Sequence, residues 1–331
     1  MKASNTQLAL AITAALASTS ALADNDTQKL QAQLDALQKE VNSLKTSSGF
    51  NLEFGGRVQL DYNYFEGAYN AGNDGSGGSD FFPRRIRTYV ESEHGNWDHK
   101  LLLEFGEGDA EIVLARVRYA FENGLKIKAG KIREDMSLNA LTSSKHINTI
   151  ERSTLANTFS PFFRWGVSAY QYFKDSGFRY AVGVYKNDAF GATGNDENDR
   201  LTLAITGRAT WSSAAPGDVI HLGAWHSYRD MGGNELGERF ARGEVRETNV
   251  RLVNYATGGK AVALDSLSQS GLEFAFQADS LTLEAEYASR ALDALNSSDD
   301  LDGERFDGFH ISASYFLGGE QRQYKAGSAL F

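Results

Sequence analysis

The sequence predicts an all-β fold, namely a transmembrane antiparallel β-barrel that follows a short helical segment. Three observations support this fold class. From Phe50 onward, apolar and polar residues alternate with a period of two, which places them on opposite faces of a strand. Aromatic residues such as Trp97 and Phe105 lie near the ends of these segments, as in the girdles of membrane barrels. The chain also begins with the features of an export signal.

Residues 1–23 are expected to be a secretory signal peptide. Lys2 supplies the positive charge, residues 8–17 (LALAITAALA) the apolar region, and residues 21–23 (ALA) the small-residue end after which cleavage is expected. The apolar region is shorter than the about 20 residues that a membrane-spanning helix needs. We therefore expect an exported protein in the outer membrane of a Gram-negative-type bacterium.

Composition argues against several other classes of protein. The chain has 331 residues, no Cys and a formal net charge of -10. A disulfide framework or a cysteine-ligated metal site is thus excluded, and nucleic acid is not an expected partner. His221 with Ser227 and His310 with Ser312 lack a nucleophile motif, so no enzyme activity is expected. The acidic runs NDENDR and DDLDGE lack the spacing of a calcium loop, and neither a metal nor a cofactor is expected.

Residues 24–47 are expected to form a short periplasmic coiled coil. The apolar positions repeat in steps of four and three residues, which is the heptad pattern. These positions are Leu30, Leu34, Leu37, Val41 and Leu44. Such a short helix is marginal alone in water, so we expect it to be ordered by assembly with copies of itself or by docking. A solvated linker is the alternative.

Residues 48–331 are assigned to the barrel, with about 13 strands counted from the alternation. In the segment 113–121, for example, Val113 and Val117 are placed on the apolar face opposite Arg116. The alternating segments occupy residues 50–64, 81–90, 97–105, 113–121, 125–128, 178–184, 201–208, 281–290 and 309–317. The longer polar connections, at residues 70–80, 191–200 and 296–308, are expected to be extracellular loops.

Cationic residues occur on the polar faces of the predicted strands. In FFPRRIRTYV (residues 81–90), Arg85 and Arg87 alternate with Ile86 and Val90. A strand avoids burying such charges in hydrocarbon if they face a water-filled lumen. The residues placed there are Arg57, Arg85, Arg87, Arg116, Arg118, Lys126 and Lys128. Cations that line a pore attract anions, and guanidinium groups suit phosphate oxygens; solvated interior charge without selectivity is the alternative.

Two stretches of the chain carry a family resemblance. FFPRRIRTYVESEHGNWDHKLLLEFGEGDAEIVLARVRYAF and then LKIKAGKIREDMSLNALTSSKHINTIERS resemble the phosphate-selective porin O and P family. Its members show an RRAR-like strand, a WDYK-like turn, FGxGxAEI and an LTSSK segment that ends in ER. Near the C-terminus, ISASYFLGGEQRQYKAG is similar to the family's ASYFLTGExRxYK stretch. The resemblance covers nearly all of the expected mature sequence.

The resemblance implies a homotrimer of 16-stranded barrels, each with an inward-folded loop that narrows its pore. Residues 133–164 correspond to this loop. Asp135 stands where the family prefers Pro, and Glu134 adds a second negative charge beside the expected anion site. By position, the residues of the constriction are Lys126, Lys128, Lys131 and Arg133 before the loop, Ser143, Ser144 and Lys145 on it, and Arg152 near its return.

The expected function is therefore a porin that forms a water-filled, anion-preferring channel for ion transport. Its expected permeants are inorganic anions of the phosphate class, phosphate or polyphosphate, and outer-membrane lipid surrounds it. A general-diffusion porin without phosphate selectivity remains an alternative, as does a structural outer-membrane protein anchored by its coiled coil. The family's barrel has more strands than are counted here, and open sheet edges are not tolerated in lipid. We therefore expect the chain to be truncated at its C-terminus; a barrel that closes differently is the alternative.

Overall fold

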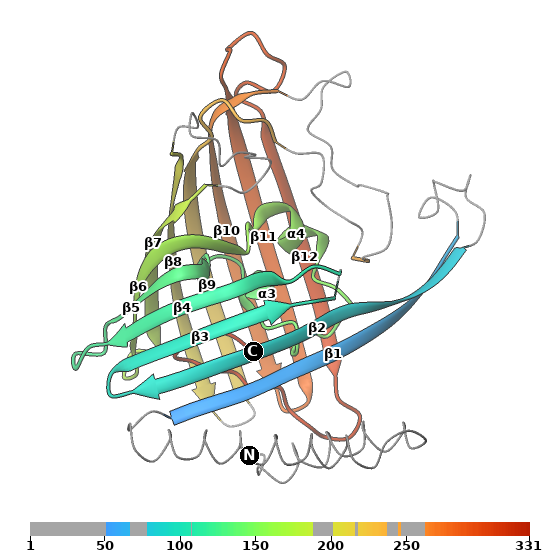
Figure 1. The fold of residues 1–331 in the computed structure, drawn as a ribbon, viewed down its shortest axis with the longest axis vertical. Helices are drawn as coiled ribbons and strands as arrows, with labels where there is room; N and C mark the ends of the chain where they lie inside the picture. The colour runs from blue at the N-terminus through green and yellow to red at the C-terminus, as the bar shows by residue number, and fades with distance from the viewer. Residues whose placement is uncertain are drawn as a thin grey trace, which may run out of the picture. The chain divides into compact units, whose positions relative to one another are not determined.

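The computed structural model describes residues 51–66, 78–106, 108–187, 201–215, 218–236, 244–245 and 262–331. They form one sheet of 12 strands whose order follows the sequence (Figure 1). The strands are β1 (Asn51–Phe65), β2 (Gly78–His94), β3 (Trp97–Glu104), β4 (Glu111–Ala120), β5 (Lys126–Arg133), β6 (Phe163–Phe173), β7 (Phe178–Lys186), β8 (Leu203–Ala215), β9 (Asp218–Asp230), β10 (Leu264–Ala278), β11 (Leu281–Ala294) and β12 (Arg305–Tyr315). The predicted all-β antiparallel class is confirmed. The sequence count of about 13 strands compares with 12 in the described part of the chain.

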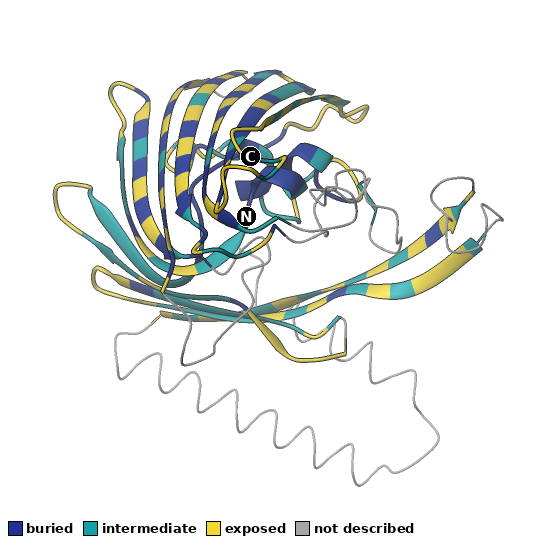
Figure 2. Cartoon of the chain, turned by 90° about the horizontal axis from the view of Figure 1, so that it is seen from above, coloured by how far each residue is buried: buried dark blue, intermediate teal, exposed yellow. Residues whose placement is uncertain are grey.

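Buried and exposed residues alternate along the strands, as the stripes in Figure 2 show. In β7, Arg179 and Tyr185 are buried, whereas Val182 and Val184 between them are exposed. Val184 pairs with Ile205 of β8, which is exposed on the same face. A shift of one residue would move every side chain of a strand to the other face. The apolar exposed face therefore fixes the register of the strands. The polar inner face is the one on which the segments between and after the strands pack.

One predicted face is corrected by a β-bulge between β3 and β4. Leu102 pairs with Leu114 and Leu103 pairs with Ile112, so Val113 is an additional residue without a partner across the strands. Val113 is buried at 7% exposure and Ile112 is exposed at 43%. The sequence analysis placed Val113 on the exposed apolar face, and this was wrong because a bulge shifts the alternation by one residue.

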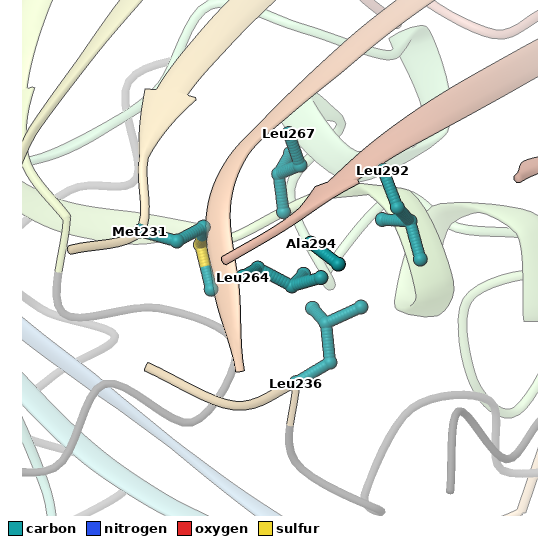
Figure 3. Packing of buried hydrophobic residues seen from close by; sticks show 6 residues of the cluster. All are labelled: Met231, Leu236, Leu264, Leu267, Leu292 and Ala294. Carbon is teal, nitrogen blue, oxygen red and sulfur yellow. The ribbon is translucent and has the colours of Figure 1, made fainter. Parts of the chain in front are cut away.

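Some apolar side chains lie on the inner side of the last strands. Figure 3 shows a buried cluster of residues from the start of β10, the end of β11 and the segment after β9. Its members are Met231, Leu236, Leu264, Leu267, Leu292 and Ala294. Burial of these side chains stabilises one end of the sheet by removing apolar surface from water. An inner face with its own apolar core departs from simple alternation of apolar-out and polar-in.

Residues 134–162, between β5 and β6, fold onto the inner face of the sheet and are called the inner segment. It contains two short helices, α3 (Leu138–Leu141) and α4 (Thr154–Phe159). Both lie within the curve of the sheet (Figures 1 and 2). Each helix begins with a serine whose hydroxyl accepts from a backbone N–H, namely Ser137 from Ala140 and Ser153 from Ala156. These N-caps satisfy helix-end donors that would otherwise be buried without a partner.

Residues 316–331, after β12, also pack on the inner face and are called the C-terminal segment. Phe331 lies in a buried cluster with Leu138 of α3 and Val219 of β9. The hydroxyl of Tyr324 lies 2.7 Å from Nδ1 of His221. The last alternating segment of the sequence was predicted to end at residue 317, and β12 ends at Tyr315, so this segment follows the last strand.

The expected signal peptide and coiled coil, residues 1–23 and 24–47, lie outside the described residues, as do residues 70–77 and 191–200 of the expected extracellular loops. The third expected loop, residues 296–308, includes the first residues of β12. Within the described ranges, every helix is too short or too polar to cross a membrane.

Candidate functional site

The base of the inner segment is anchored by two buried acidic residues. Glu134 pairs with Arg229 of β9 and accepts from the hydroxyl of Thr206 over 2.9 Å. Asp135 pairs with Lys128 at 2.8 Å and with Arg179 at 3.2 Å. Burial by itself would raise the pKa of Asp135, but the charges of these two cations outweigh it and hold the pKa well below its usual range. The negative charges of both carboxylates are therefore compensated by cations on the strands of the sheet.

The two helices of the inner segment are also tied to the wall. Glu286 of β11 accepts from the backbone N–H groups of Leu138 and Asn139 at 2.5 and 3.2 Å, at the start of α3. Arg290, also on β11, donates to the Thr158 carbonyl of α4 over 2.8 Å. A carboxylate at a helix start and a cation at a helix end each complement the helix dipole. The position of the inner segment is thus fixed by charged groups of β5, β7, β9 and β11.

Two arginines bind the carbonyl groups at the end of α3. Nη1 of Arg133 donates to the carbonyls of Ala140, Leu141 and Thr142 over 2.6 to 3.1 Å. Nη2 of Arg152 donates to the same Thr142 carbonyl over 2.6 Å. These contacts add no compensating negative charge, because carbonyl oxygens are uncharged acceptors. They hold the chain directly before Ser143 and Ser144.

Arginines of β1 and β2 contact the middle of the inner segment. Nη2 of Arg57 donates to Oγ of Ser144 over 2.8 Å. Arg84 and Arg85 both pair with the carboxylate of Glu151. Within the described residues, Nε of Arg57 is buried and has no hydrogen-bond partner. Arg57 thus combines a full charge with an unused donor.

These arginines form one electropositive site, called the arginine cluster. Arg87 of β2 pairs with Glu104 of β3 over 2.5 Å. Burial and the positive charge of Arg85 lower the pKa of Arg152 to about 10, and Glu151 offsets part of this effect. The members of the cluster are Arg57, Arg84, Arg85, Arg87, Arg133 and Arg152. In the described part of the chain, two carboxylates, Glu151 and Glu104, pair with three of these six cations, so the cluster carries a net positive charge.

The other cations selected from the sequence lie outside the cluster or have other partners. Arg116 and Arg118 of β4 both pair with Asp98 of β3. Lys131 donates to the Ile112 carbonyl over 2.6 Å. Lys128 is one of the anchors described above, and Lys126 begins β5. Sequence reasoning also missed Arg84, because alternation assigns only every second residue of a strand to the inner face.

A cavity of about 780 Å³ lies between the inner segment, the end of β12 and the C-terminal segment. It is lined among others by Lys145, His146, Arg322 and Lys325. The Nζ atom of Lys145 lies 5.6 Å from the centre of the Tyr89 ring. Arg322 pairs with Glu284 at 2.6 Å and also donates to the His146 carbonyl. The cavity thus brings further cations near the inner segment, from a part of the chain that the sequence analysis did not select.

The arrangement is suited to hold small anions rather than metal ions. Guanidinium, ammonium and hydroxyl groups donate hydrogen bonds and can replace part of the water shell of an anion. Within the described ranges, His, Asp and Glu residues form no group of three or more that could hold a metal ion. The expected loop at residues 133–164 and the strand arginines are brought together by the contacts of Arg57, Arg84 and Arg85.

The fold combines three features: an antiparallel sheet with an apolar exposed face, a charged inner face, and a segment folded onto that inner face. This is the architecture of an outer-membrane channel. The phosphate-selective porin O and P family matches residues 52–330, and the chain belongs to this family. It is therefore an outer-membrane porin, and its family indicates a channel rather than an enzyme.

Several known proteins are similar to this chain. Porin O of Pseudomonas aeruginosa is 25% identical over 320 residues, which covers 86% of this chain and 68% of Porin O. A loop L8 deletion mutant of OmpT from Vibrio cholerae is 11% identical with a TM-score of 0.40 and covers 81% of this chain and 89% of its own. An anion-selective porin from Comamonas acidovorans is 11% identical with a TM-score of 0.32 and covers 80% of this chain and 99% of its own.

Proposed function

We propose that this porin forms an anion-preferring channel whose permeants are small inorganic anions of the phosphate class. The observation that carries the proposal is the arginine cluster, in which two carboxylates pair with three of the six cations in the described part of the chain. Inside a partly dehydrated constriction, each unbalanced charge acts more strongly than in bulk water. A net positive charge at that place favours anions and opposes cations.

The chemistry of the cluster favours phosphate oxygens in particular. Guanidinium groups present several N–H donors in one plane, which match two oxygens of a phosphate group. The hydroxyls of Ser143 and Ser144 lie on the inner segment, and Ser144 is in direct contact with Arg57. Similarity to Porin O and membership of a family described as phosphate-selective support the same class of permeant. Polyphosphate is an extended member of this class.

Conductance measurements on the purified protein in planar lipid bilayers test the proposal. In a salt gradient of KCl, the reversal potential should have the sign of an anion-preferring channel. Added phosphate should reduce the chloride current at concentrations well below that of chloride, because phosphate occupies the same donors. A cation-preferring reversal potential would refute the proposal, whereas ohmic conductance with little selectivity would indicate a general-diffusion porin.

The proposal extends to the assembly expected from the sequence. It includes removal of residues 1–23, a coiled coil over residues 24–47, and a barrel from residue 48 that is of the 16-stranded type, with 12 strands in the described residues, and forms a homotrimer in lipid. The heptad pattern and the family resemblance support it. The mass of the protein extracted in mild detergent tests the trimer, which requires three chains per particle.

Anion preference should increase at acidic pH through His146. Burial, followed by the positive charges of Lys325, Lys145 and Arg322, lowers the pKa of His146 below its ordinary value. His146 is then neutral at pH 7 and gains a positive charge only as the pH falls through this lowered pKa. We expect the reversal potential to shift further toward the anion limit over that pH range.

A His146→Gln variant should lose this pH-dependent shift and keep the preference of the unmodified channel at pH 7. His226 provides the matched control because it is exposed on the opposite face of the sheet, and His226→Gln should leave the pH profile unchanged. Identical pH profiles for all three proteins would show that His146 does not lie on the ion path.

A further inference from the structure

Glu151 is the acidic side chain that the inner segment places against the arginine cluster. Its carboxylate accepts from Nε of Arg84. Both of its oxygens also lie near Nη2 of Arg85, at 3.3 and 3.2 Å. The side chain is 10% exposed, and that of Arg85 is 2% exposed. One carboxylate thus occupies donors of two neighbouring arginines in the same site.

The other acidic residues of this region have different partners. Glu134, Asp135 and Glu286 contact cations or N–H groups that join the inner segment to the wall. Glu104 pairs with Arg87, but it also accepts from the backbone N–H groups of Ile86 and Gly106 at 2.8 and 3.1 Å. Glu104 therefore also joins the end of β3 to β2. Glu151 differs because it pairs with two neighbouring arginines of the cluster, Arg84 and Arg85.

Pairing with Glu151 has a direct consequence for an anion that enters the cluster. The anion meets Arg84 and Arg85 with part of their donors already occupied by a carboxylate, which is itself an anion. To bind these arginines fully, it must compete with Glu151. Conduction requires binding that is strong enough for entry and weak enough for release. A carboxylate fixed beside the site lowers the binding strength without removing the arginines.

The inner segment has several anchors besides Glu151. Glu134 and Asp135 anchor its start, Glu286 holds the start of α3, and Arg133 binds the end of α3. These contacts lie on strands other than β2. Loss of the Glu151 charge therefore changes the charge balance of the cluster while the main anchors stay in place.

We propose that Glu151 is a specificity-determining residue of the channel, an internal competitor that occupies Arg84 and Arg85 and limits how tightly the cluster holds a permeating anion. This role of Glu151 rests on the proposed anion conduction, and it assigns to Glu151 the control of how strongly the cluster binds an anion. If Glu151 were only an anchor, loss of its charge would have the opposite effect. The inner segment would loosen, the constriction would widen, and the selectivity for anions would fall.

The variant Glu151→Gln tests this inference because it removes the charge and keeps the shape of the side chain. The anion-to-cation permeability ratio should rise about threefold to tenfold, since one charge near a partly hydrated site contributes on that order. The concentration of phosphate that halves the chloride current should fall by a similar factor of about ten at most. Stronger retention of anions should also lower the chloride conductance at saturating salt.

Two matched variants separate competition from anchoring. Glu111→Gln makes the same chemical change at a side chain that is 69% exposed and pairs with Lys131, and it should leave both measured quantities unchanged. Glu151→Asp keeps the negative charge and should retain a selectivity close to that of the unmodified channel. In an Arg84→Gln background, the gain from Glu151→Gln should become smaller because one of the two contested arginines is absent.

The outcomes distinguish this inference from the proposed function. An unmodified channel without anion preference would overturn both. If the unmodified channel prefers anions but Glu151→Gln leaves the permeability ratio and the phosphate block unchanged, the inference alone is overturned. It is also overturned if Glu151→Gln lowers the selectivity and raises the conductance, because that result shows an anchor.

Discussion

Charge reversal at Arg57 should lower the anion-to-cation permeability ratio about tenfold or more. Arg57 lies on β1, donates to the Ser144 hydroxyl and forms no ion pair among the described residues. Its charge thus has no paired carboxylate in the described part of the chain, unlike the charges of Arg84 and Arg85. Arg57→Glu changes the charge of the site by two units, and Arg57→Gln should produce about half of the shift in free energy. Reversal potentials in a KCl gradient measure both.

Arg305→Glu is the matched control for this prediction. Arg305 is the first residue of β12 and is exposed, so reversal of its charge should be screened by salt and change the ratio little. Equal shifts for Arg57→Glu and Arg305→Glu would mean that the arginine cluster lies away from the ion path. The assignment of the cluster as the selectivity site would then be lost.

Charges on the inner face of the sheet have two distinct roles. On β5 to β11, the partly buried Lys128 and the buried Arg179 share Asp135, and the buried Arg208 and Arg229 each pair with a buried glutamate. Such pairs give little net charge, and their removal leaves an unbalanced charge in a low-dielectric place. On β1 and β2, arginines outnumber their carboxylate partners. In the first group, Lys128, Arg179 and Arg229 position the inner segment, and Arg208 donates to the Ala329 carbonyl of the C-terminal segment. The second group gives the site its positive charge.

Period-two alternation was sufficient to predict the outer faces of several strands. In β1, Val58, Leu60, Tyr62 and Tyr64 are all exposed, as the pattern indicates. The prediction fails where other forces act on the strand. Val113 is displaced by a bulge, which no composition rule reveals. The predicted segments also omitted β10, because Leu264 and Leu267 on its inner side pack into the buried cluster of Figure 3 and obscure the alternation.

The candidate site could be predicted only in part for a similar reason. Alternation and the family resemblance selected Arg57 and Ser144, which are in contact although they are far apart in sequence. Neither reveals that Arg133 and Arg152 bind backbone carbonyls, because a carbonyl leaves no signal in the side-chain sequence. The pairing of Lys128 with Asp135 depends on the turn after β5. The C-terminal segment was missed because it follows no period at all.

Loss of the cation that faces Glu134 should produce the largest loss of stability. Arg229 and Glu134 are both fully buried, and the carboxylate has only the Thr206 hydroxyl as a further side-chain partner among the described residues. Arg229→Met leaves a buried charge without its cation, so the free energy of unfolding should fall by about 3–5 kcal/mol. Denaturant unfolding of the protein in detergent micelles, followed by tryptophan fluorescence, measures this loss. Arg305→Met, at an exposed position, should change it by about 0.5 kcal/mol at most.

The double variant Arg229→Met with Glu134→Leu should recover most of the lost stability. Removing both charges eliminates the uncompensated carboxylate, and well-packed apolar side chains are often as stable as a buried ion pair. The single variant should also expose Lys145 and Arg152 of the inner segment to trypsin, and the double variant should protect them again. If the double variant is as unstable as Arg229→Met, the loss comes from the missing arginine side chain itself. In that case the Glu134 pair is not what holds the inner segment against β9.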